Sequence, residues 1–306
     1  MSKIIKKTFQ ILVILTIFIF LIRNLILNWI KIPFKDLHFN PFMLFLSYIF
    51  LTIHFIIYVF SWKALLKKLN VIVGFANSFW MIATSQIAKY LPGGIWYAVG
   101  RIYLAKKEKL AGENTTISVI LETCLIMIAG IVIFFLLLLT KSVNIKINVI
   151  YIIIVLLISL VLLHPYLLTV IINIFLKLIK KPTVKFNISY WSLIKLSSFF
   201  LSFWIAQILG FYFLICSIYP LPLTMIFAVA VAYILSWTIG FIAIFAPGGL
   251  GIREGTMTLY LSTIMPLPVA IAISLISRIW ITVFEVIVFF MGLIIQKNTK
   301  KRANTE

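Results

Sequence analysis

Acidic residues are scarce in this sequence, with 7 Asp and Glu against 27 Lys and Arg among 306 residues. The only aspartate is Asp36, which excludes an aspartate-rich metal cluster. Both cysteines, Cys124 and Cys216, stand in apolar runs without CxxC spacing, and the three histidines are isolated, so no disulfide framework or metal site is predicted. The HExxH, GxSxG and Walker patterns are also missing. The sequence therefore predicts no enzymatic activity, no cofactor and no metal.

Apolar residues dominate instead, because 63% of the chain is hydrophobic and only 11% is charged. The mean hydropathy of +1.18 is typical of an all-α polytopic membrane protein. The net charge of +20 fits lysines that orient membrane spans and meet anionic lipid, so nucleic acid is not an expected partner. Six windows are long enough to be full spans, at residues 8–29, 41–62, 115–140, 149–175, 192–216 and 267–295. Asn40 and Thr115 are typical helix-capping residues at two of their starts.

Two further apolar windows, 71–90 and 223–245, run into Pro-Gly-Gly sequences. The first break is Pro92-Gly93-Gly94, and the second is Pro247-Gly248-Gly249 with Gly251 close behind. Proline removes a backbone donor and glycine allows sharp bends, so each break should end a helix abruptly. Backbone groups freed in hydrocarbon must be paired by protein or trapped water. The seven proline and glycine residues are therefore predicted to shape a polar cavity.

The distribution of lysine and arginine decides whether these two windows cross the membrane. If all the windows cross, the loop cations divide 12 against 10 between the two sides, which is no bias. If each broken window enters and leaves by one face, the division becomes 18 against 4, as the positive-inside rule requires. We therefore expect two re-entrant helical hairpins, location in the cytoplasmic membrane and both termini in the cytoplasm. The four outer cations are Lys31, Lys35, Lys141 and Lys146.

The hairpin topology divides the chain into two halves of opposite orientation. Residues 1–145 contain two spans, a cytoplasmic hairpin and a third span, and residues 146–295 contain two spans, a hairpin from outside and a third span. Such an inverted repeat, with broken helices meeting near the midplane, is typical of transporters that bind substrate at the breaks. Residues 296–306 are polar and are expected to form a disordered cytoplasmic tail.

Ionisable residues in or beside the apolar windows are candidates for a binding site, because a charge in hydrocarbon needs a partner or a watery cavity. Arginine forks and the backbone N–H groups of glycine breaks suit a phosphate. The alternative is that these charges form internal ion pairs, and Arg101 could simply begin a cytoplasmic loop. Lys89 either lines the same cavity or extends to the membrane surface. The predicted substrate-binding residues are Arg101, Glu122, Arg253, Glu254, Arg278 and Glu285.

Two stretches carry a family resemblance: Pro92-Gly93-Gly94 with Gly100-Arg101, and the nine residues from Pro247 to Gly255. They resemble the transmembrane region of lysylphosphatidylglycerol synthases, also called the flippase-like domain family. The resemblance covers essentially the whole chain, and the second stretch is its specific part. In relatives where a soluble aminoacyltransferase domain is fused to this region, the region moves the modified lipid between leaflets. This sequence contains no such soluble domain, which puts lysyl transfer in doubt, and the resemblance implies lipid translocation without fixing the lipid.

The expected function is therefore that of a lipid translocase, which moves a phosphate-bearing lipid headgroup between leaflets. Its expected partner is a membrane lipid of the anionic or polyprenyl-phosphate type, together with a possible lipid-modifying enzyme. One alternative is a membrane-embedded headgroup transferase of an aminoacyl or glycosyl pathway, with Glu254 or Glu285 as base. The other is a non-catalytic membrane subunit of a glycosyltransferase system.

Overall fold

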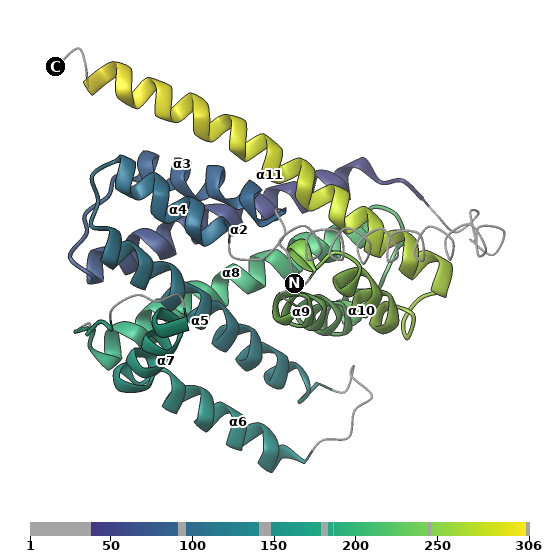
Figure 1. Ribbon diagram of the computed structural model, residues 1–306. Coiled ribbons are helices and arrows are strands. Elements are labelled where there is room, and N and C mark those ends of the chain that lie inside the picture. The colour runs from purple at the N-terminus through teal and green to yellow at the C-terminus, as the bar shows by residue number, and fades with distance from the viewer. Residues whose placement is uncertain are drawn as a thin grey trace, which may run out of the picture. The chain divides into compact units, whose positions relative to one another are not determined.

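The computed structural model describes residues 38–90, 96–140, 148–178, 183–185, 187–243 and 246–303. Every regular element within these ranges is a helix, which confirms the all-α prediction (Figure 1). The expected first span at 8–29 and the first break at Pro92, Gly93 and Gly94 lie outside the described residues. The helices are α2 Pro41–Lys68, α3 Phe75–Gln86, η3 Ile87–Tyr90, α4 Trp96–Lys107, α5 Gly112–Leu137, α6 Val149–Leu162, α7 Pro165–Leu178, α8 Tyr190–Cys216, η4 Leu223–Met225, α9 Ile226–Ile242, η5 Pro247–Gly249, α10 Ile252–Leu261 and α11 Leu267–Ala303.

Five helical stretches are long and apolar enough to cross a membrane: α2, α5, α8, η4 with α9, and α11. The helices that follow the two breaks are shorter, with 12 residues in α4 and 10 in α10. At 1.5 Å per residue they extend only about 18 and 15 Å, against a hydrocarbon core of about 30 Å. Their lengths suit the returning arms of hairpins. The stretch Leu223–Ile242 has 20 residues and could cross, so length alone does not assign it to a hairpin.

Contacts between neighbouring segments also suit two helix–break–helix hairpins. Helix α10 packs along α9 beyond the second break (Figure 1). On the other hairpin, Arg101 of α4 donates to the Ser85 hydroxyl of α3 at 3.3 Å. Each returning helix therefore contacts the helix before its break.

The expected span at 149–175 is not one straight helix. Helices α6 and α7 are bent by 76° at Leu163 and His164. Pro165 explains the break, because proline lacks the N–H group that a continuing helix needs and its ring clashes with the preceding turn. The sequence prediction overlooked this proline.

Two helix ends differ from the sequence prediction, and one agrees. Asn40 caps α2 as predicted, with its side-chain oxygen accepting from the Phe42 and Met43 N–H groups at 3.1 and 3.2 Å. Thr115 is not a cap, because α5 begins three residues earlier, and its hydroxyl donates to the Ala111 carbonyl. Helix α11 continues to Ala303, so most of the expected disordered tail is helical.

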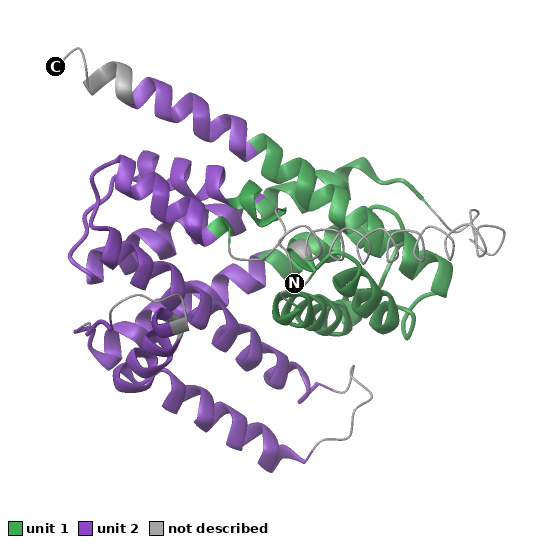
Figure 2. Cartoon of the chain, viewed as in Figure 1, with its two compact units in different colours: residues 1–51, 86–97, 207–287 green, residues 52–85, 98–206, 288–306 purple. Residues whose placement is uncertain are grey.

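The chain forms two compact units (Figure 2). Unit 1 comprises 1–51, 86–97 and 207–287, and unit 2 comprises 52–85, 98–206 and 288–306. Each unit takes segments from both of the predicted halves, and the inverted repeat stays a prediction. In unit 2, Gly130 of α5 lets the Trp204 ring of α8 approach, since a Cβ there would lie 3.1 Å from the indole. The Trp204 Nε1 group donates to the Ile126 carbonyl at 3.0 Å.

Candidate functional site

The second break forms a glycine turn between α9 and α10 in unit 1. Gly248, Gly249 and Gly251 have φ values of 58°, 70° and 82°, in the left-handed region that residues with a Cβ rarely adopt. A Cβ on Gly249 would also lie 2.8 Å from the Gly240 carbonyl oxygen of α9. Backbone conformation therefore requires the three glycines of the second break, and close packing also requires Gly249.

Glu254 and Arg278 hold this turn in place. Glu254, in the first turn of α10, accepts a hydrogen bond from the Gly251 N–H group at the start of the helix. Arg278 of α11 pairs with the Glu254 carboxylate and donates a second bond to the Gly248 carbonyl. The Gly251 N–H group, one of the backbone donors of the breaks that were expected to suit a phosphate, is thus occupied by the carboxylate of Glu254.

The segment before the first break reaches the same turn within unit 1. Lys89 of η3 pairs with Glu285 of α11, and the Tyr90 hydroxyl donates to the same carboxylate at 2.8 Å. The hydroxyls of Tyr90 and Thr282 lie 3.0 Å apart. A Cβ on Gly248 would be 3.7 Å from the Lys89 carbonyl, so η3 and η5 are in contact. The segment before the first break and the turn of the second break therefore supply residues to one site.

Arg253 is the cation that this site leaves without a carboxylate. Its side chain lies between Gly240 and Gly249, and Cβ atoms on either glycine would come within 2.8 Å of its Nε. The guanidinium carbon is 5.5 Å from the centroid of the Trp237 ring, a cation–π contact. Within the described ranges, its buried Nε has no hydrogen-bond acceptor, and no carboxylate forms an ion pair with it.

We call the five charged residues of this site the charge cluster: Lys89, Arg253, Glu254, Arg278 and Glu285. Three cations face two carboxylates, and the carboxylates are engaged by Arg278 and Lys89. Electrostatic interactions link Arg253 to Arg278, Glu254 and Glu285, and link Lys89 to both arginines. The cluster therefore carries one excess positive charge beside a glycine turn.

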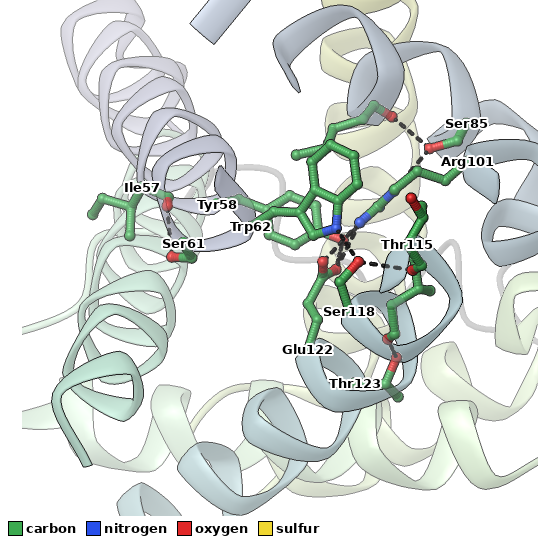
Figure 3. A network of polar contacts seen from close by, with 12 residues as sticks. Ile57, Tyr58, Ser61, Trp62, Ser85, Arg101, Thr115, Ser118, Glu122 and Thr123 are labelled. Atoms are coloured by element: carbon green, nitrogen blue, oxygen red, sulfur yellow. Dashed lines mark hydrogen bonds and ion pairs between the residues drawn. The ribbon is translucent and has the colours of Figure 1, made fainter. Parts of the chain in front are cut away.

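The remaining predicted pair, Arg101 and Glu122, lies in unit 2 and is fully engaged (Figure 3). The Arg101 guanidinium donates to both Glu122 oxygens, at 3.0 and 2.7 Å, and to the Tyr58 hydroxyl at 2.8 Å. Its carbon also lies 5.1 Å from the Trp62 ring, whose N–H group donates to Ser118. The two side chains are 0% and 1% exposed. This geometry favours the internal-ion-pair alternative for Arg101 and Glu122.

Sequence reasoning missed two aromatic residues of the site. Tyr90 follows Lys89 directly, and its position just before the first break could have marked it as a candidate site residue. Trp237 carried no signal, because its contact with Arg253 depends on how α10 packs on α9. In the described part of the chain, no three His, Cys, Asp or Glu side chains are grouped so as to hold a metal.

Comparison with known proteins assigns the chain to a family. The family model described as lysylphosphatidylglycerol synthase TM region matches residues 8–288. The chain belongs to this family. The lysylphosphatidylglycerol synthase TM region thus includes both breaks, the charge cluster and the Arg101–Glu122 pair. No curated protein and no solved structure matches the chain. Together with its apolar helices, membership of the family identifies a multi-pass membrane protein whose function relates to lipid.

Proposed function

We propose that this protein is a lipid translocase of the cytoplasmic membrane, with both termini in the cytoplasm. The headgroup phosphate of its lipid would bind at Arg253 while the acyl or prenyl tails stay in the bilayer. The observation that carries this proposal is the excess cation of the charge cluster, Arg253, which lies between Gly240 and Gly249. A guanidinium presents a fork of donors that matches phosphate oxygens.

The membrane setting strengthens the argument from charge. An unneutralised cation at membrane depth is costly, so the site gains when an anion enters. One excess positive charge suits an anionic headgroup better than a zwitterionic one. Arg101 differs, because Glu122 already neutralises it and its side chain is fully buried. We therefore assign headgroup binding to Arg253 and a structural role to Arg101.

The test is lipid flipping in proteoliposomes that contain fluorescent phosphatidylglycerol or fluorescent phosphatidylcholine. We expect faster flipping of the anionic lipid by the unmodified protein. Arg253→Gln should slow that flipping by about tenfold to a hundredfold, because a hydrogen bond to a charged group contributes about 1.5–3 kcal/mol. Arg253→Lys should retain part of the rate, since it keeps the charge but loses the fork.

The control variant is Lys195→Gln, which removes an exposed cation of α8 in unit 2. Its flipping rate should equal that of the unmodified protein. A wild-type rate for Arg253→Gln would refute the proposed site. If incubation with lipid and an aminoacyl or glycosyl donor yielded a modified lipid, the transferase alternative would replace the proposal.

A further inference from the structure

Glu285 is the carboxylate that joins the charge cluster to the segment before the first break. Its carboxylate accepts from Lys89 and Tyr90 of η3, and it also interacts electrostatically with Arg253 of α10. Thr282, one turn earlier on α11, shares the Tyr90 hydroxyl. The carboxylate thus accepts from two residues of η3, while Arg253 of α10 acts on it only electrostatically.

The two carboxylates of the cluster differ in how firmly they are held. Glu254 is 3% exposed, caps α10 and binds an arginine that is also anchored to Gly248. Glu285 is 9% exposed, and its partner Lys89 is 21% exposed. Lysine is a flexible point charge, whereas arginine makes a fixed fork. The Lys89–Glu285 pair is therefore the one that an incoming anion can open.

The predicted repeat sharpens the contrast between the two glutamates that follow the breaks. In unit 2, Glu122 binds Arg101, the arginine that follows the first break, and both are fully buried. In unit 1, Glu285 does not pair with the corresponding Arg253 but with Lys89. Lys89, which precedes the first break, thus forms the ion pair with Glu285 that Arg253 would form if the two halves were alike.

We propose that Glu285 acts as a built-in competitor of the headgroup phosphate. In the empty site it holds Lys89, and an arriving phosphate takes Lys89 from it, so that Lys89 and Arg253 bind the phosphate together. This inference rests on the proposed function. It adds Lys89 as a second cationic residue that binds the headgroup, and it adds a latch. The latch joins η3 to α11 through Lys89, Tyr90 and Glu285.

The latch predicts that weakening the bonds of Glu285 to Lys89 and Tyr90 tightens phosphate binding. Binding is measured on the purified full chain by fluorescence anisotropy of short-chain fluorescent phosphatidylglycerol, with fluorescent phosphatidylcholine as comparison. Apparent affinity falls with the fraction of molecules that are closed, so a latch closed in about nine tenths of them weakens binding about tenfold. Glu285→Gln should therefore bind phosphatidylglycerol up to about tenfold more tightly. Tyr90→Phe, which removes only one donor, should tighten it about threefold.

Lys89 variants test the second half of the inference. Lys89→Met should weaken phosphatidylglycerol binding about tenfold, because a charge-assisted hydrogen bond is lost, and Lys89→Arg should restore most of it. Unlabelled dihexanoyl phosphatidylglycerol should compete with the probe, and inorganic phosphate at the same concentration should not. Competition by inorganic phosphate alone would overturn the assignment to a lipid headgroup.

The outcomes separate this inference from the proposed function. If Arg253→Gln abolishes binding while Glu285→Gln and Tyr90→Phe bind as the unmodified protein does, the latch is wrong and the translocase site stands. If Arg253→Gln binds normally, the site itself is wrong. If Glu285→Gln does not fold, Tyr90→Phe decides, because it removes one of the two bonds of the latch without removing a charge; unchanged affinity then refutes the latch.

Discussion

Gly240 of α9 lies directly against the side chain of Arg253 of α10. A Cβ on Gly240 would overlap the aliphatic part of that side chain and stand 2.8 Å from its Nε. The absence of a side chain at position 240 therefore decides where the free cation of the charge cluster can lie. The contact gives a way to move Arg253 without changing any charge.

Gly240→Ala should slow flipping of anionic lipid by at least about tenfold, or ~1.4 kcal/mol in the barrier, because Arg253 is displaced. The same substitution adds helix propensity to α9, so a weaker helix would not explain the loss. The matched control is Gly255→Ala on α10, where nothing lies within 4 Å of the added Cβ. Equal rates for both alanine variants would contradict the role of this packing.

Arg101→Met should destabilise the protein more than it affects headgroup affinity. It leaves Glu122 buried without its partner, and breaking a buried ion pair costs about 3–5 kcal/mol. Thermal unfolding of the purified protein measures the effect. The double variant Arg101→Met with Glu122→Leu should recover most of the stability, because no buried charge remains. If the single variant unfolds as the unmodified protein does, the structural role is wrong.

Arg278→Lys should slow flipping although it keeps the charge. A lysine cannot bridge the Glu254 carboxylate and the Gly248 carbonyl as the arginine fork does, so the glycine turn loses one of its two ties. We expect a loss of about tenfold, the equivalent of ~1.4 kcal/mol. Glu254→Gln serves as the comparison, because glutamine can still cap α10. A normal rate for Arg278→Lys would show that charge alone is needed.

The topology is tested by labelling single cysteines from outside intact cells. Cys124 and Cys216, which are both free, are replaced first. The hairpin topology predicts that Asn144→Cys reacts with an impermeant reagent and that Lys106→Cys reacts only after the membrane is opened. Labelling of both positions in intact cells would eliminate the re-entrant hairpin at the first break.

Most of the fold class could be predicted from the sequence, because apolar length and helix-breaking residues act locally. Asn40 capped its helix as expected, and the glycines of the second break adopt the positive φ values that favour glycine. The bend at Pro165 was predictable by the same rule and was missed. The start of α5 was not predictable from Thr115, because threonine can also bond back to the preceding turn within a helix.

The ionisable residues of the site were also visible in the sequence, because charges in apolar windows are conspicuous. Their pairing was not. The adjacent residues Arg253 and Glu254 do not pair with each other, and Glu254 binds Arg278, 24 residues further along the chain. Glu285 binds Lys89, which is separated from it by 196 residues. Such partners are set by how helices pack, which spacing along one helix does not reveal.

The sequence by itself determined a helical membrane protein with two glycine breaks and a small set of intramembrane charges. Composition and local backbone chemistry suffice for that, since hydrocarbon tolerates few other structures. Only the tertiary structure decided which cation stays free. In that structure Arg101 pairs with Glu122, and Lys89 pairs with Glu285. Arg253 lies between two glycines and Trp237 without a carboxylate partner in the described part of the chain. Which charge stays without an ion-pair partner depends on all the ion pairs that the packed helices form, and helix packing brings together residues that are far apart in the sequence.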